Sequence, residues 1–145
     1  MEIYSIGFTQ KSASQFFELL KSHSIKRLLD VRLNNVSQLA GFSKRDDIAY
    51  FLREIVGAEY QHEPMLAPTQ ELLDAYKKQK GNWSDYERKF NALMAEREVD
   101  KRLDPNSFKV PTVLLCSEAT PDHCHRRLVL DFLNERWGGV RAVHL

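Results

Sequence analysis

The segment from Cys116 to Arg127 concentrates the side chains of this chain that are best suited to chemistry. Its sequence, CSEATPDHCHRR, contains two thiols, two imidazoles, two carboxylates and two guanidinium groups. The apolar run Val113-Leu114-Leu115 before it predicts a buried strand, and Pro121 and Asp122 predict the start of a helix. A helix N-terminus binds anions and lowers the pKa of a nearby thiol. We therefore expect any reaction of this protein to be centred on this junction.

Three kinds of site are compatible with this segment. In the first, Cys116 or Cys124 is a thiolate nucleophile, with His125 as its base and Glu118 orienting the histidine. In the second, cysteine, histidine and glutamate bind a transition metal. The two cysteines lack the short spacing of structural zinc pairs, so we assign no metal ligand. In the third, Arg126 and the helix N-terminus hold an anionic ligand. A fourth interpretation is that both cysteines are simply packed, since free cysteine is among the most buried residue types.

A second group of candidates lies at the expected end of another strand, in Asp30-Val31-Arg32. Asp30 and Arg32 are two residues apart, so they lie on one face of that strand. They form either an internal salt bridge or an anion site in which Asp30 holds Arg32 or acts as a base. Tyr60 and His62, also two apart, are the remaining candidates for substrate binding.

The order of the expected elements predicts how these segments are positioned. Apolar spacing, capping residues and glycines indicate strands at 2–6, 25–31, 59–62, 110–116 and 140–145 and helices at 12–22, 46–56, 69–80, from 84 onward, and at 121–137. We expect one α/β domain over residues 1–145, with three layers: a mainly parallel sheet with helices on both faces. Ligands of such folds bind beyond the carboxyl ends of the strands, where residues 7–10, 30–32 and 116–125 should converge.

Composition limits the classes of function. The chain has 145 residues, of which 43% are hydrophobic and 28% charged, as is typical of a globular protein. A formal net charge of +1 gives no whole-chain argument for binding nucleic acid or a membrane. No apolar run is long enough for a membrane helix, and the N-terminus does not resemble a signal peptide. We therefore expect a cytoplasmic protein without a membrane partner, in a compartment that disfavours structural disulfides.

Taken together, several motifs resemble the DUF488 family, small prokaryotic proteins named for a domain of unknown function. The resemblance covers nearly the whole chain and rests on SIGFT at 5–9, LLDVR at 28–32, YQHEP at 60–64, LLCSE at 114–118 and CHR at 124–126. The family often has histidine where this chain has Phe8, and proline where it has Asn35. The resemblance implies an α/β fold and a crevice lined by Asp30, Arg32, Cys116, Glu118, Cys124, His125 and Arg126, but it implies no particular activity.

A looser similarity connects the chain with rhodanese-like domains, which also have Asp-Val-Arg at one strand end and a buried strand that ends in cysteine before a helix.

The leading hypothesis is an enzyme, or a degenerate enzyme, acting on an anionic, phosphate-bearing substrate that Arg32 and Arg126 bind. The alternatives are a non-catalytic module that binds a nucleotide or nucleic acid and has packed cysteines, and a metal-stabilised module. The sequence specifies no cofactor and no oligomeric state.

Overall fold

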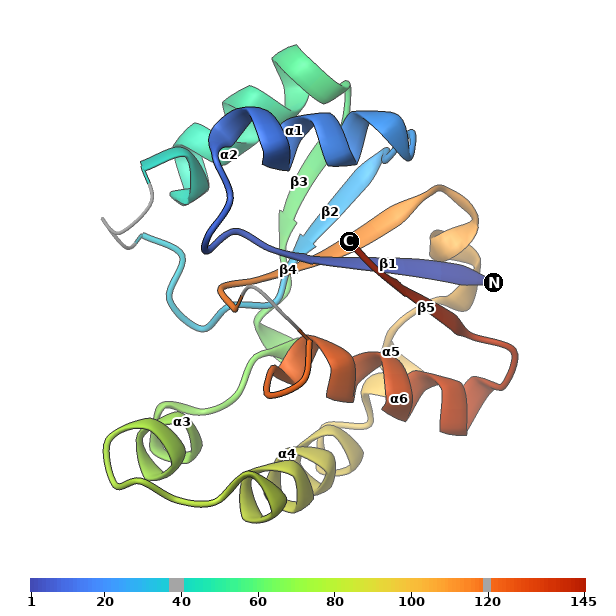
Figure 1. Cartoon of the computed structure of the whole chain (residues 1–145). Coiled ribbons are helices and arrows are strands. Elements are labelled where there is room, and N and C mark those ends of the chain that lie inside the picture. The colour runs from blue at the N-terminus through green and yellow to red at the C-terminus, as the bar shows by residue number, and fades with distance from the viewer. Residues whose placement is uncertain (37–40, 119–120) are drawn as a thin grey trace.

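The computed structural model describes residues 1–36, 41–118 and 121–145, and its centre is a parallel β-sheet between two helical layers (Figure 1). The strands are β1 (Glu2–Gly7), β2 (Arg27–Asp30), β3 (Glu59–His62), β4 (Thr112–Cys116) and β5 (Arg141–His144). Their order across the sheet is β3-β2-β4-β1-β5, and every strand pairing is parallel. The predicted α/β class is confirmed.

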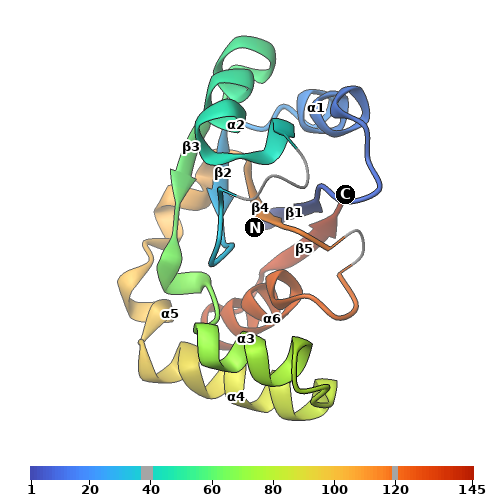
Figure 2. The same ribbon diagram turned by 90° about the vertical axis from the view of Figure 1, so that its left-hand side faces the viewer.

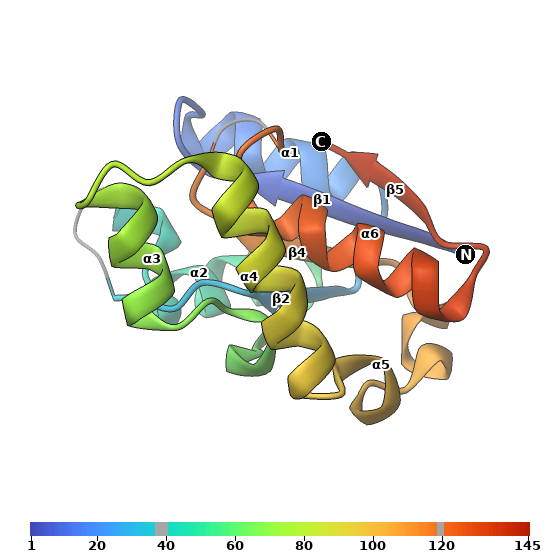
Figure 3. The ribbon, with the colours of Figure 1, turned by 90° about the horizontal axis from the view of Figure 1, so that it is seen from below.

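The helices form one layer on one face of the sheet and a thicker layer on the other (Figures 1 and 2). On the first face lie α1 (Ala13–Ser22) and α2 (Arg45–Phe51), and on the second lie α3 (Gln70–Lys77), α4 (Trp83–Glu96), α5 (Val99–Arg102) and α6 (His125–Trp137). Helix α6 packs against the sheet, α4 packs against α6, and α3 pairs with α4 at the outside (Figure 3). Among the described residues, no helix is both long and apolar enough to cross a bilayer.

Alternating side chains along the central strands separate two buried cores. Leu28, Val113 and Leu115 face the core under α1 and α2. Leu29, Leu114 and Cys116 belong to the core under α6 and α4. Since side chains alternate along a strand, the position of Cys116 in β4 directs its thiol toward α6.

The carboxyl end of β4 lies where the chain changes faces of the sheet. The segments after β1 and β2 lead to α1 and α2, whereas the segment after β4 leads to α6 on the opposite face (Figure 1). The three loops meet there: Thr9 N–H donates to the Ser117 carbonyl at 3.1 Å, and Val31 N–H donates to the Leu115 carbonyl at 3.1 Å. The crevice at such a switch point is the usual ligand site of open α/β sheets.

The start of the last helix differs from the prediction. Residues 121–123 form a turn in which Cys124 N–H donates to the Pro121 carbonyl at 3.3 Å, and α6 begins only at His125. Proline and aspartate are common both in turns and at the start of helices, so Pro121-Asp122 does not distinguish the two locally, which explains the error. Cys124 is consequently the N-cap residue, with extended backbone, instead of a residue inside the helix.

Several other segments differ from the expected elements. The helix expected over 46–56 ends as α2 at Phe51 and continues as a π-helical turn, Leu52–Val56, which Gly57 terminates at φ 75°. Helix α5 and a 3-10 helix, Pro105–Lys109, were not predicted. Of the long loop expected over residues 32–43, residues 37–40 lie outside the described part, and Gly41–Ser43 form a 3-10 helix.

Candidate functional site

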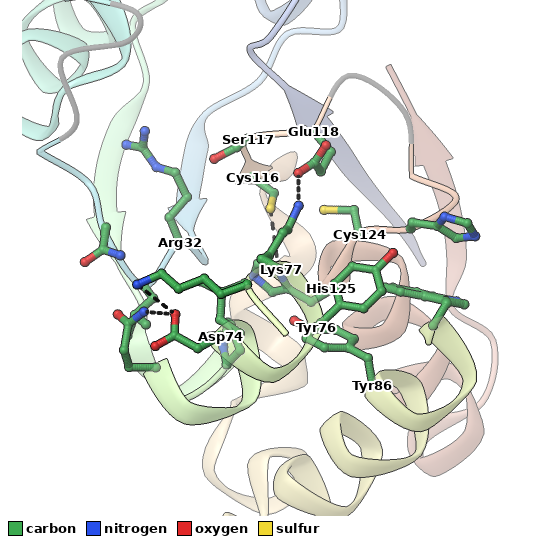
Figure 4. A pocket seen from close by; sticks show the side chains of 18 residues that line it. Arg32, Asp74, Tyr76, Lys77, Tyr86, Cys116, Ser117, Glu118, Cys124 and His125 are labelled. Carbon is green, nitrogen blue, oxygen red and sulfur yellow. Dashed lines mark hydrogen bonds and ion pairs between the residues drawn. The ribbon is translucent and has the colours of Figure 1, made fainter. Parts of the chain in front are cut away.

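A cavity of about 350 Å³ lies beyond the carboxyl ends of β2 and β4, beside α3 and α4 (Figure 4). Its floor contains Cys116, Cys124 and His125. One wall consists of the aromatic side chains of Tyr76, Trp83 and Tyr86, which contact one another. Its charged lining residues are Arg32, Asp74, Lys77, Lys78 and Glu118. The cavity therefore combines a sulfur and imidazole floor, an aromatic wall and a charged rim.

Cys116 and His125 form the central contact of the floor. The Cys116 Sγ lies 3.6 Å from Nδ1 of His125, and Nε2 of the same ring lies 2.6 Å from the Val31 carbonyl. Because a carbonyl only accepts hydrogen bonds, Nε2 must carry the proton. In the neutral ring, Nδ1 then presents its lone pair to the thiol. The backbone of the β2 loop thus fixes His125 in the tautomer that accepts a proton from Cys116.

The surroundings of Cys116 favour its thiolate. A hydrogen bond from Cys124 contributes most to lowering the pKa of Cys116; burial acts against it, while the N–H groups of Ser117 and Glu118 and the charge of Arg126 lower it further. The same hydrogen bond, together with burial, raises the pKa of Cys124. The pair therefore favours one negative charge on Cys116, with Cys124 as the protonated donor.

Arg126 is a fully buried cation beside these thiols. Its Nη1 donates to the Glu118 carbonyl at 2.6 Å and lies 3.8 Å from the Cys124 Sγ, and its Nε donates to Ser5 Oγ at 3.2 Å. Within the described part of the chain, its Nη2 has no hydrogen-bond partner, and it forms no ion pair with a carboxylate. Since an uncompensated buried charge is costly, the positive charge of Arg126 favours the thiolate form of Cys116.

Asp30 and Arg32 form a buried, bidentate ion pair. Arg32 Nε donates to one Asp30 carboxylate oxygen and Nη2 to the other, each at 2.8 Å, and Nη2 also donates to the Ser43 carbonyl. The Tyr60 hydroxyl donates to Asp30 at 2.6 Å, and His62 Nε2 lies 2.9 Å from the Arg32 carbonyl. Asp30, Tyr60 and His62 therefore support the loop that holds His125, and they do not line the cavity.

Glu118 contacts a helix that the sequence did not connect with the site. Its carboxylate accepts from Lys77 of α3 at 2.7 Å, whereas the group that orients His125 is the Val31 carbonyl. Burial lowers the pKa of Lys77, but the hydrogen bond and charge of Glu118 outweigh it and the net shift is upward. Lys77 and Lys78 look like a solvent-exposed helix face in the sequence, and only the packing of α3 places them at the rim.

Gly7 allows β1 to approach the loop that follows β4. A Cβ at this position would lie 1.6 Å from the Glu118 carbonyl oxygen and 2.8 Å from Nη1 of Arg126. That carbonyl is the group to which Arg126 donates. Gly7 is therefore required by the site itself, in addition to ending the first strand.

Three of the side chains could also bind a metal ion. One ligand atom from each of Cys116, Cys124 and His125 lies within 4.8 Å of the other two, and all three residues are buried. The hydrogen bond from His125 Nε2 to a carbonyl is typical of metal-binding histidines. Glu118, the fourth residue proposed from the sequence, is paired with Lys77 instead.

Fold and site together define an α/β protein with a buried cysteine–histidine pair at the switch point of a parallel sheet. A family model described as "Domain of unknown function DUF488" matches residues 12–133, so the chain belongs to the DUF488 family. No curated protein and no solved structure matches the chain.

Proposed function

We propose that this protein is a cysteine-dependent enzyme that acts on a small anionic substrate bound in the cavity. The contact between Cys116 Sγ and His125 Nδ1, with the histidine tautomer fixed by Val31, is the observation that carries the proposal. Cys116 attacks an electrophilic centre of the substrate, and its proton passes to His125 Nδ1. The bond between that centre and the leaving group breaks, and His125 returns this proton to the leaving group. A water molecule, deprotonated by His125, then displaces Cys116 from the bound group and restores the free thiol. Arg126 compensates the thiolate charge and does not contact the substrate.

The charges of the rim support an anionic substrate. Lys77 and Lys78 are exposed and pair with Glu118 and Asp74 at 2.7 and 3.6 Å. Exposed ion pairs of this kind contribute only about 0–1 kcal/mol, so a substrate anion can displace their carboxylates at little cost. Arg32 also lines the cavity, but its guanidinium is already bound by Asp30. The lysines are therefore better placed than Arg32 or Arg126 to bind the anion.

The cavity is suited to a compact organic phosphate. Its volume of about 350 Å³ is at the lower end of the range for small-molecule sites. The aromatic wall of Tyr76, Trp83 and Tyr86 offers ring faces and edges to a flat or apolar part of the ligand. A phosphate ester with an aromatic group, such as a nucleotide, combines both features.

Iodoacetate and iodoacetamide test this proposal, because they alkylate thiols by the same reaction and differ in one negative charge. We expect the ratio of iodoacetate to iodoacetamide rates at Cys116 to exceed that of free cysteine. Lys77→Ala should lower the ratio severalfold, whereas Lys89→Ala, an exposed lysine of α4 outside the cavity, should not change it. Inorganic phosphate should slow both reagents.

Two results would contradict parts of the proposal. A ratio equal to that of free cysteine and insensitive to Lys77→Ala would exclude recognition of an anion at the rim. Failure of both reagents to label Cys116 in the folded protein would exclude a thiol enzyme, and a ligand-binding module with packed cysteines would then be the better account.

A metal-stabilised module is the second candidate, favoured by the cluster of Cys116, Cys124 and His125. It predicts about one equivalent of metal in protein purified without a tag. It also predicts a lower melting temperature with a chelator, since metal binding contributes directly to folding. Metal-free protein whose melting temperature does not respond to zinc or to a chelator would exclude it.

A further inference from the structure

We propose that Cys124 is a resolving cysteine, so that Cys116 and Cys124 form a reversible disulfide when Cys116 is oxidised by a hydroperoxide. The inference rests on the proposed role of Cys116 as a thiolate nucleophile. It adds a redox reaction, and a role for Cys124, to the same site.

The position of the two sulfur atoms supports this pairing. The ligand atoms of Cys116, Cys124 and His125 all lie within 4.8 Å of one another. Cys116 is held at the end of β4, while Cys124 is the N-cap residue of α6 and makes no side-chain capping hydrogen bond. Closing the disulfide brings these two sulfur atoms from within 4.8 Å of each other to the bond length of about 2.05 Å. Both residues line the cavity, through which a small hydroperoxide can enter (Figure 4).

The two thiols differ in the way that such a reaction requires. The first cysteine must be a thiolate, and the second must stay protonated until the first has been oxidised. The shared hydrogen bond lowers the pKa of Cys116 and raises that of Cys124. His125 contacts both side chains and is therefore placed to remove the second proton.

The oxidation proceeds in two steps. The Cys116 thiolate attacks one oxygen of the hydroperoxide; the sulfur–oxygen bond forms, the oxygen–oxygen bond breaks, and the leaving alkoxide or hydroxide takes a proton. The sulfur is now a sulfenic acid, oxidised by two electrons, and the peroxide is reduced by two. Cys124, deprotonated by His125, then attacks the Cys116 sulfur. The disulfide forms, and hydroxide leaves as water with the proton that His125 took.

Arg126 makes this disulfide easy to reduce. The reduced pair carries a thiolate that compensates the buried guanidinium, whereas the disulfide is neutral and leaves Arg126 without that charge. Stabilising the reduced form shifts the equilibrium away from the disulfide, as in strongly oxidising thiol–disulfide pairs. The disulfide is thus suited to repeated oxidation and reduction, and poorly suited to a permanent structural role.

Hydrogen peroxide and a sulfenic-acid trap, dimedone, test the role of Cys124 in the full-length protein. We expect the wild type to lose both thiols without a dimedone adduct and to recover them with dithiothreitol. Cys124→Ser should accumulate the adduct on Cys116, and Cys116→Ser should keep its remaining thiol reduced. Dimedone labelling of the wild type equal to that of Cys124→Ser would overturn the inference. The inference would also be overturned if both thiols resisted hydrogen peroxide until a chelator was added, because this result would indicate a bound metal.

Equilibration with glutathione redox buffers tests the contribution of Arg126. Arg126→Met should shift the equilibrium toward the disulfide by about tenfold or more, which for this couple corresponds to about 30 mV. The equilibrium should shift much less in Arg126→Lys, which retains the charge. It should also shift much less in Arg127→Met, because Arg127 is a partly exposed neighbour that pairs with Asp131. If Arg126→Met fails to fold, Arg126→Lys takes its place as the test. The inference would then be supported if Arg126→Lys had the same reduction potential as the wild type and if the wild-type disulfide could be reduced. If the reduction potential of the wild-type Cys116–Cys124 pair were as low as that of structural disulfides, the proposed role of Arg126 would be overturned.

These results separate the inference from the proposed function. Rapid alkylation of Cys116 without disulfide formation would remove the role of Cys124 and leave the nucleophile in place. Resistance of Cys116 to both peroxide and alkylation would remove both.

Discussion

Replacing Asp30 with asparagine is expected to destabilise the protein by about 3–5 kcal/mol, because it leaves the buried Arg32 guanidinium without its charge partner. The asparagine amide would also direct N–H groups at a site that already contains the donors of Arg32 and Tyr60. Chemical denaturation measures the change in the free energy of unfolding. The loss should be accompanied by slower alkylation of Cys116, because the neighbouring Val31 carbonyl holds His125.

Two further variants make this prediction specific. Asp46→Asn removes a carboxylate that pairs with Arg45 at 3.2 Å in an exposed position, and it should cost at most about 1 kcal/mol. Asp30→Asn combined with Arg32→Met should recover part of the lost stability, because the unpaired buried charge is then gone. Equal effects of Asp30→Asn and Asp46→Asn would show that the buried pair does not anchor the loop.

Replacing His125 with glutamine is expected to slow alkylation of Cys116 at pH 7 by about tenfold or more. Glutamine can still donate a hydrogen bond toward the Val31 carbonyl, but it cannot accept and hold the thiol proton as an imidazole does. Losing about 1.4 kcal/mol of stabilisation of the thiolate form lowers its population tenfold. The rates of variant and wild type should converge at high pH, where the thiol ionises without help.

His123→Gln provides the matched control for His125→Gln. His123 lines the same cavity two residues away, but it is exposed and contacts the ring of Trp83 instead of a thiol. This variant should keep the wild-type rate across the pH range. If the two variants slowed the reaction equally, His125 would have no special connection with the Cys116 proton.

The strands and their relative direction could be predicted because they depend on local patterns. The apolar runs at Leu28-Leu29 and Val113-Leu115 are separated by helical segments, and such an order favours a parallel sheet with crossover connections. That arrangement brings the carboxyl ends of β1, β2 and β4 together, so Gly7, Asp30 and Cys116 could be expected near one another. The start of α6 was missed because proline satisfies the local rules for a turn and for a first helical turn alike.

The partners of individual side chains could not be predicted, because they depend on tertiary packing. The sequence does not show that the Val31 carbonyl, and not Glu118, bonds to His125. It also does not show that Arg126 is buried with no carboxylate partner among the residues that the structure describes, or that Lys77 reaches the cavity. The aromatic residues of α3 and α4 occur at helical spacing, which is equally typical of a core face. Only the docking of α4 against α6 assigns them to the cavity wall.

The most direct test of the central claim is the alkylation rate of Cys116 and of Cys124 by iodoacetamide against pH, with each site assigned by mass spectrometry and with a chelator as control. Cys116 should react first, with a midpoint below the ordinary thiol value of about 8.5, and Cys124 should react slowly, with a higher midpoint. A Cys116 midpoint at or above the ordinary value, or two thiols inert in the folded protein whether or not chelator is present, would contradict a thiolate site.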